Sequence, residues 1–269
     1  MNLELQGQTA VIVGGAQGIG KATAIAFAEE GANLALLDRS PEVEQTANQI
    51  AEQHPIQTSA HVGDITDFDS LQTIASDIQE RYGRIDHVVH TAAIGSGKFG
   101  FPFWNLTPND WTKVLEVNII GTVHVAHAFA PYLVERKAGS LLFFASVAGQ
   151  MGSQTDPPYS ASKAAVINFA QCAAKDLAPH GVRVNALSPG MVVTALNHSV
   201  WEAWNRQQPP ESQKSYEEWA GEKVKQIVPL QRWQSPEDIA SMAVFLASAR
   251  GQNITGQTIN VDGGYVMHS

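Results

Sequence analysis

A turn rich in glycine constrains this chain more than any other feature of its sequence. It joins the apolar run 10–13 to an apolar-periodic stretch at 21–30 and carries Gly14, Gly18 and Gly20. Glycine suits a tight turn whose backbone approaches a pyrophosphate, and the N-terminus of the following helix attracts negative charge. The spacing is G-x-x-x-G-x-G and not G-x-G-x-x-G, so the turn alone also fits an ordinary strand-to-helix connection.

Strand-like runs alternate with helix-like stretches along most of the chain. Further strands are expected at 33–37, 58–62, 87–90, 140–145, 182–187 and 258–261. Helices are expected after Ser40-Pro41, Thr107-Pro108 and Ser235-Pro236, and over 159–177. Such alternation is typical of a parallel sheet with helices on both faces. We therefore predict an α/β fold, a single doubly wound Rossmann-type domain over residues 1–269 with about seven strands.

One interval, from Met191 to Trp233, contains no convincing strand. Ser215 and Glu218 predict a capping box for a short helix in it. Its tryptophans are Trp201, Trp204 and Trp219. Long excursions in compact domains are usually lids or binding loops, so we predict a helical flap at about 191–233. The tryptophans either form a substrate lid or pack the flap onto the body.

Composition excludes several classes of function. The 269 residues carry a net charge of −9 and no run rich in Lys or Arg, which leaves nucleic acid or an anionic membrane no basic surface to bind. Cys172 is the single cysteine, so no intrachain disulfide is expected. The first residues lack signal-peptide character, and no apolar run reaches ~18 residues. We expect a soluble, cytoplasmic protein.

An acid at the end of the second expected strand bears on the cofactor. Asp38 follows Gly20 by 18 residues, where a carboxylate can bind adenosine ribose hydroxyls and repel a 2′-phosphate. Two unit charges ~4 Å apart repel by ~4 kcal/mol at an effective dielectric of 20. If solvent screens this repulsion to ~1.4 kcal/mol, it still favours NAD over NADP tenfold. We predict NAD over NADP, although Arg39 could pair with a 2′-phosphate. The alternative is that Asp38 merely precedes a helix.

Tyr159 and Lys163 stand at i and i+4 of an expected helix and so share one face. A hydride-transfer enzyme needs an acid or base for the alcohol proton, and a neighbouring ammonium can bring a tyrosine pKa of ~10 toward the working range. Such a pair alone is more often a surface pair. Ser146, however, lies at the end of the strand 140–145, where open α/β sheets bind ligands. Together they predict an oxidoreductase site for a carbonyl or alcohol.

These residues resemble the short-chain dehydrogenase/reductase family over essentially the whole chain. Its glycine motif matches at Gly14, Gly18 and Gly20, and its catalytic tetrad carries over as Asn118, Ser146, Tyr159 and Lys163. The resemblance implies that Tyr159 is the proton donor or acceptor and that Lys163 lowers its pKa and holds the nicotinamide ribose. It also implies that Ser146 positions the substrate oxygen, and that Asn118 holds a water linking Lys163 to solvent.

The resemblance extends to the cofactor site. Asp64-Ile65 is similar to the family's adenine-contacting pair, and Pro189-Gly190 with Thr194 is similar to the segment around the nicotinamide carboxamide. Val13 departs from the family's usual Thr, which removes a hydroxyl that bonds a neighbouring loop. The expected cofactor residues are Gly14, Gln17, Gly18, Ile19, Gly20, Asp38, Arg39, Asp64, Ile65, Ala92, Tyr159, Lys163, Pro189, Gly190, Val192 and Thr194.

The flap resembles those of family members that oxidise sugars and polyols, which implies a secondary alcohol of that class as substrate. The expected substrate contacts are Ser146, Tyr159, Lys98, Trp104, Gln150, Met151 and Trp201. Alternatives are a 3-oxoacyl thioester or hydroxysteroid-type reductase, and a non-catalytic dinucleotide-sensing protein, against which the intact tetrad argues. The resemblance also implies a homotetramer. No metal is expected, since His124 and His127 lack an evident third ligand.

Overall fold

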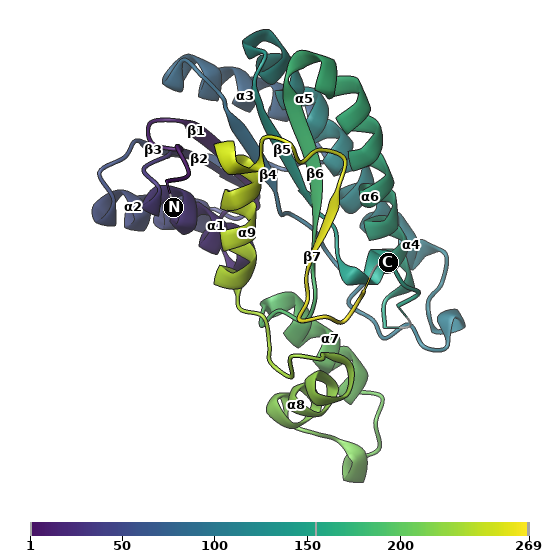
Figure 1. The fold of residues 1–269 in the computed structure, drawn as a ribbon. Helices are drawn as coiled ribbons and strands as arrows, with labels where there is room; N and C mark the ends of the chain where they lie inside the picture. The colour runs from purple at the N-terminus through teal and green to yellow at the C-terminus, as the bar shows by residue number, and fades with distance from the viewer. Residues whose placement is uncertain (1, 154, 268–269) are drawn as a thin grey trace.

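Seven parallel strands form one sheet in the computed structural model, which describes residues 2–153 and 155–267 apart from the side chains of Ala195 and Leu196. The strands are β1 (Thr9–Val13), β2 (Asn33–Asp38), β3 (Thr58–Val62), β4 (His87–His90), β5 (Gly139–Phe144), β6 (Val182–Pro189) and β7 (Thr258–Val261). Their order in the sheet is β3-β2-β1-β4-β5-β6-β7 (Figure 1). The predicted doubly wound Rossmann-type sheet is therefore confirmed.

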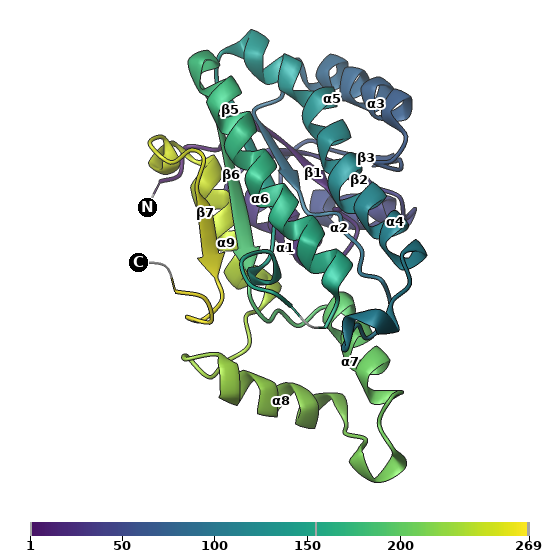
Figure 2. The ribbon, with the colours of Figure 1, turned by 90° about the vertical axis from the view of Figure 1, so that its right-hand side faces the viewer.

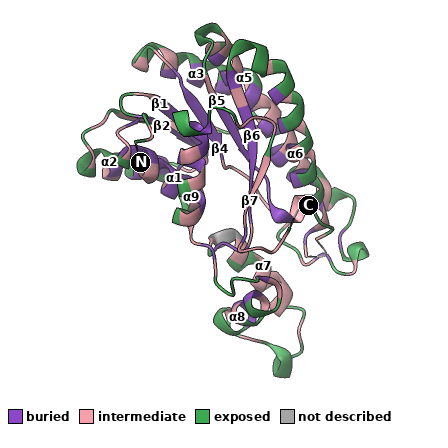
Figure 3. Ribbon diagram, viewed as in Figure 1, coloured by how far each residue is buried: buried purple, intermediate pink, exposed green. Residues whose placement is uncertain are grey.

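Helices cover both faces of this sheet (Figures 1 and 2). On one face lie α1 (Gly18–Glu29), α2 (Glu42–Gln53) and α9 (Pro236–Ala247). On the other lie α3 (Phe68–Tyr82), α4 (Asn109–Leu115), α5 (Gly121–Arg136) and α6 (Pro157–Leu177). Because successive strand residues point to opposite faces, Ile12 packs under α1 and its neighbours Val11 and Val13 pack under the other layer. The inner strands are accordingly buried on both faces, whereas the edge strands β3 and β7 are only partly buried (Figure 3).

The strand order reverses beside β1. This strand pairs with β2 on one side and with β4 on the other, so the connections that follow β1 and β4 run to opposite faces. Such a reversal opens a crevice at the carboxyl ends of the strands, where open α/β sheets bind ligands. Short 3-10 turns lie at Phe103–Asn105, Val147–Gly149, Ala178–His180, Pro210–Ser212 and Ala249–Gly251.

A π-helical segment, Glu116–Ile120, joins α4 to α5 in one continuous helical run. This run, Asn109–Arg136, is long and apolar enough to cross a membrane by those two criteria, and half of its most apolar window is buried. Its inner residues, among them Val125 and Phe129, pack against the sheet and α3. Core packing accounts for its apolar character.

Two further helices, α7 (Ala195–Asn205) and α8 (Tyr216–Ile227), lie beyond the carboxyl end of β6 (Figures 1 and 2). The capping box predicted for Ser215 and Glu218 is present at the start of α8. The tryptophans contact other aromatic rings of this region, and the Trp204 and Trp219 rings lie 6.2 Å apart. These contacts pack α7 against α8 within the flap.

Candidate functional site

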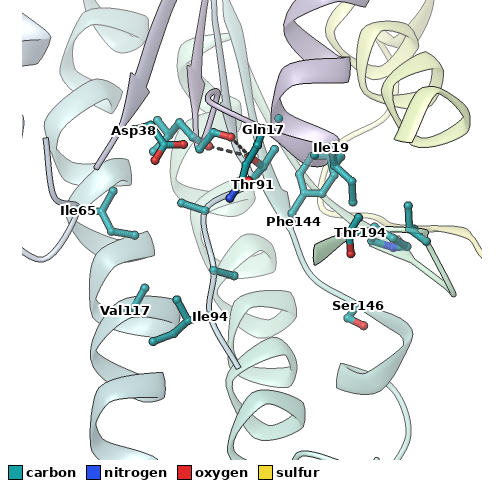
Figure 4. Close-up of a pocket in the computed structure, with 18 of the residues that line it drawn as sticks. Gln17, Ile19, Asp38, Ile65, Thr91, Ile94, Val117, Phe144, Ser146 and Thr194 are labelled. Atoms are coloured by element: carbon teal, nitrogen blue, oxygen red, sulfur yellow. Dashed lines mark hydrogen bonds between the residues drawn. The ribbon is translucent and has the colours of Figure 1, made fainter. Parts of the chain in front are cut away.

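A cavity of about 420 Å³ lies along the carboxyl ends of the strands. It is walled by the connections that follow β1 to β6 together with α6 and α7, and Figure 4 shows part of its lining. Every residue that the sequence predicted for the cofactor site lines this cavity, from Gly14 to Thr194 in sequence order. Ser146 also lines it, beside Tyr159 and Lys163.

The turn between β1 and α1 requires glycine at two positions. Gly14 has a φ of +90°, and a Cβ there would lie 2.5 Å from Thr91 Oγ1. A Cβ on Gly20 would lie 1.9 Å from the carbonyl oxygen of Gly14. At Gly18, by contrast, a Cβ would meet nothing within 4 Å, because this position faces the open cavity. The turn thus brings bare backbone to the N-terminus of α1, which fits the pyrophosphate of a dinucleotide.

The Val13 departure from the family pattern has a structural counterpart. Thr91, just after β4, donates a hydrogen bond from Oγ1 to the Val13 carbonyl oxygen at 2.9 Å. Its backbone nitrogen donates to the same carbonyl at 2.8 Å. The hydroxyl that couples the two loops therefore comes from the β4 side.

Asp38 is fixed at the end of the cavity expected to hold the adenosine. Its Oδ2 accepts from the backbone nitrogen of Ala16 and its Oδ1 from that of Ser40, each at 3.0 Å. Two hydrogen bonds from opposite sides hold the carboxylate in place at the cavity wall. Arg39 is exposed beside it, and Asp64 lines the same end. Hydrogen bonds from Thr66, first from its backbone nitrogen, lower the pKa of Asp64.

Ser146, Tyr159 and Lys163 meet at the other end of the cavity. Ser146 follows β5, and the other two stand one turn apart near the start of α6. Lys163 donates from Nζ to the carbonyl oxygen of Phe144 at 2.6 Å, and its Nζ lies 5.5 Å from the centre of the Tyr159 ring. This arrangement places a phenol hydroxyl, a second hydroxyl and an amine around one point at the strand ends.

Burial sets the protonation of this group in the cofactor-free chain. It raises the pKa of Tyr159 to about 12, against a hydrogen bond with Ser146 that lowers it, while the charge of Asp156 raises it further. Burial also lowers the pKa of Lys163 to about 7. In the cofactor-free chain Lys163 donates its hydrogen bond to Phe144 and is not among the causes that shift the Tyr159 pKa, so the lowering of that pKa by Lys163 stays a prediction.

Asn118 stands in the π-helical segment and is almost fully buried. Its Nδ2 donates to the Ile94 carbonyl oxygen at 2.9 Å and to Ser162 Oγ at 3.0 Å, and its Oδ1 accepts from the Ile94 backbone nitrogen at 2.9 Å. Ser162 Oγ in turn donates to the Tyr159 carbonyl oxygen at 2.7 Å. The side chain therefore ties the loop after β4 to α6, the helix that carries Tyr159 and Lys163. π-Helical turns often occur at functional sites.

The structure places two of the expected substrate contacts outside the cavity wall, on the loop after β4. Lys98 pairs with Asp110 at 2.7 Å and points along the surface. Trp104 is 71% exposed and stacks edge-on against Phe103. A local ion pair and a local ring contact hold both side chains in place.

Three more expected substrate contacts lie elsewhere. Gln150 donates from Nε2 to Ser188 Oγ at 2.9 Å and to Asn260 Oδ1 at 2.7 Å, which ties it to the ends of β6 and β7. Met151 lines a separate, open depression together with Gln150. Trp201 donates from Nε1 to the carbonyl oxygen of Lys214 at 3.1 Å and so faces α8. Of the expected substrate contacts, only Ser146 and Tyr159 line the cavity.

Several residues of the cavity wall were not predicted from the sequence. Asn197 and Val200 on α7 line it, as do Ile94 and Val117 near the middle. The sequence around Asn197 indicates only a helix cap, because Asn197 follows Thr194 by three residues. In the structure its backbone nitrogen donates to Thr194 Oγ1 at 3.3 Å. This spacing does not indicate a contact with a ligand.

The two histidines considered as metal ligands have packing roles. His124 Nδ1 lies 2.9 Å from the Ile65 carbonyl oxygen, and its ring centre is 5.2 Å from that of Phe68. His127 contacts the same phenylalanine edge-on at 6.4 Å. Among the described residues, no group of three or more metal-ligating side chains is found.

Comparison with known proteins agrees with the geometry. Residues 14–266 match the family model described as enoyl-(acyl carrier protein) reductase. The chain is 34% identical to the 3-oxoacyl-(acyl-carrier-protein) reductase FabG of Thermotoga maritima, over 98% of this chain and 100% of the relative. It is 33% identical to a galactitol 2-dehydrogenase of Agrobacterium fabrum, over 98% of this chain and 100% of the relative. An NAD+-bound xylitol dehydrogenase superposes with a TM-score of 0.89 at 27% identity, over 97% and 100%. The chain belongs to the short-chain dehydrogenase/reductase family and is an oxidoreductase of CH–OH groups.

Proposed function

We propose that this protein reversibly oxidises a secondary hydroxyl group of a sugar or polyol, with NAD as the hydride acceptor and NADP disfavoured. One observation carries the proposal: Ser146 and Tyr159 stand at one end of a cavity whose other end presents the fixed Asp38 carboxylate. The relative named as a galactitol 2-dehydrogenase and the solved structure of a xylitol dehydrogenase support the substrate class.

The residues divide the chemistry between them. When bound, the nicotinamide ring supplies the hydride acceptor. The hydroxyl groups of Ser146 and Tyr159 hold the substrate oxygen, and Tyr159 Oη takes the hydroxyl proton in oxidation and returns it in reduction. Since burial raises the Tyr159 pKa to about 12, the tyrosine of the free enzyme is protonated at neutral pH. It is therefore in the state that donates, and oxidation needs added positive charge to ionise it.

A substrate panel tests the proposal. Purified protein with NAD, and separately with NADP, is incubated with polyols, sugars, a hydroxysteroid and the 3-hydroxyacyl thioester of acyl carrier protein, and NAD(P)H absorbance is followed. We expect the fastest turnover with NAD and a polyol or sugar. Turnover confined to the thioester or the steroid would replace the substrate class. NAD binding without turnover of any compound would favour the dinucleotide sensor.

The Asp38 carboxylate predicts the cofactor preference. In Asp38→Ser, the ratio of kcat/KM with NADP to that with NAD is expected to rise at least about tenfold, because a ~1.4 kcal/mol repulsion of the 2′-phosphate is removed. The backbone N–H groups of Ala16 and Ser40, which now donate to the carboxylate, also become free to bind phosphate. Initial rates with both cofactors measure the ratio. Arg39→Ala is the matched control and should lower NADP use; an unchanged ratio in Asp38→Ser would contradict the assignment.

We also propose that the protein acts in the cytoplasm and that it is a homotetramer, as the family resemblance implies for the assembly. Light scattering of the purified chain measures the mass in solution, for which we expect four copies of the 29.0 kDa chain. A mass corresponding to a monomer would contradict this assembly.

A further inference from the structure

The wall of the cavity contributed by α7 carries a polar group that the mechanism does not use. Asn197 and Val200 line the cavity from this helix, close in sequence to Thr194 and on the same lining as Ser146 and Tyr159. Val200 is apolar, so Asn197 is the side chain of α7 that can offer a hydrogen bond to a bound molecule.

Contacts in the structure fix which end of the Asn197 amide is already engaged. Tyr216, the first residue of α8, donates from Oη to Asn197 Oδ1 at 3.0 Å. The described residues supply no hydrogen-bond acceptor for the Asn197 Nδ2 group. An amide held by its oxygen keeps two N–H donors available. Asn197 therefore presents a donor at the cavity wall.

Tyr216 is itself held firmly in an aromatic cluster. Its ring centre lies 4.9 Å from that of His198, 5.8 Å from Trp201, and 6.3 Å from both Trp219 and Trp233. Aromatic pairs at these separations each add about 0.5–1.5 kcal/mol beyond their burial. The cluster thus ties α7 to α8 and fixes the hydroxyl that orients Asn197.

We infer that Asn197 is a specificity-determining residue that donates a hydrogen bond from Nδ2 to a substrate hydroxyl next to the reacting carbon, and that Tyr216 positions it. This inference rests on the proposed function, since it assigns a second polar contact to a substrate with more than one hydroxyl group. A site that hydrogen-bonds a substrate hydroxyl discriminates against an analogue lacking it, because its donor is then left unpaired. The same donor gives no advantage to an alcohol with a single hydroxyl.

The test compares two alcohols at saturating NAD: the best polyol of the panel, and a secondary alcohol of the same chain length with one hydroxyl. The variants are Asn197→Ala, the nearly isosteric Asn197→Asp and Tyr216→Phe. Tyr82→Phe is the matched control, since Tyr82 donates to the Leu34 carbonyl and to Ser59 far from the cavity. Melting temperatures establish that each variant is folded.

We expect kcat/KM for the polyol to fall roughly three- to tenfold in Asn197→Ala, through KM, the range of one ordinary hydrogen bond. For the same substrate, kcat/KM should fall as much in Asn197→Asp and about threefold in Tyr216→Phe. In all three variants, kcat/KM for the single-hydroxyl alcohol and the Kd of NAD should stay within about twofold of wild type. The Tyr82→Phe control should keep both quantities, and kcat/KM for the polyol, within the same range. Equal losses for both alcohols, or a rise in the Kd of NAD, would overturn the inference. The wild-type rates alone decide the proposed function, whereas the variant ratios decide the role of Asn197.

Discussion

Replacement of Tyr159 by phenylalanine is expected to lower kcat by about 10²–10⁴-fold, the usual contribution of a positioned acid or base. The phenyl ring fills the same space beside Lys163, but it has no hydroxyl to exchange the alcohol proton or to bond with Ser146. The cofactor cradle around Gly14 and Asp38 is untouched, so the Kd of NAD should change by less than about threefold. Initial rates of NADH formation and a fluorescence titration with NAD measure the two quantities.

The controls separate a chemical role from a packing role. Tyr132→Phe, on α5, removes a partly buried tyrosine hydroxyl outside the cavity lining and should leave kcat unchanged. Ser146→Ala should lower kcat less severely than Tyr159→Phe, since it removes a donor to the substrate oxygen and leaves the acid in place. A Tyr159→Phe enzyme that kept a tenth of its kcat or more would show that another group transfers the proton.

Local sequence patterns were sufficient to predict the fold and to gather the residues from Gly14 to Thr194 that line one cavity. A parallel sheet buries both faces of its central strands, so runs such as 10–13 and 34–37 are continuously apolar and stand out from the helices between them. The turn at Gly14 and Gly20 admits no Cβ, so its glycines are dictated by sterics. Connections at the ends of parallel strands converge, which explains why residues as far apart as Asp38 and Thr194 line one cavity.

The substrate end could not be predicted in the same way, because side-chain direction decides it. Lys98 and Trp104 belong to the right loop, yet neither lines the cavity: Lys98 pairs with Asp110, and Trp104 lies largely exposed against Phe103. Asn197 reaches the wall by contrast, and its partner Tyr216 stands 19 residues further along the chain on another helix. No periodicity within one helix encodes that pairing.

Lys163 gives the prediction with the largest effect on stability. Burial lowers its pKa from 10.5 to about 7, so the folded chain disfavours its charge. Below pH 7 the amine is charged in both the folded and the unfolded chain, and the full cost of burying the charge is present. Between pH 7 and 10.5 only the unfolded chain keeps the proton, so the stability of the folded chain rises with pH.

Lys163→Met should abolish turnover, because it removes the amine beside Tyr159. It should also be more stable than wild type at low pH, because it buries no charge. The free-energy advantage of the variant should be about 2–3 kcal/mol larger at pH 6 than at pH 9, since about two pKa units of the shift titrate between them. The lost hydrogen bond to the Phe144 carbonyl subtracts about 1 kcal/mol at every pH and does not alter this difference.

Urea unfolding of both proteins at pH 6 and pH 9 measures the effect, because all other titrating groups are common to the two chains and cancel. Lys175→Met is the matched control, because it makes the same substitution at an exposed position of the same helix. If the free energies of unfolding of Lys163→Met and wild type change equally between pH 6 and pH 9, the Lys163 ammonium is as well stabilised in the fold as in water. The amine would then be fully charged at neutral pH in the free enzyme, and its charge would already act on Tyr159 before the cofactor binds.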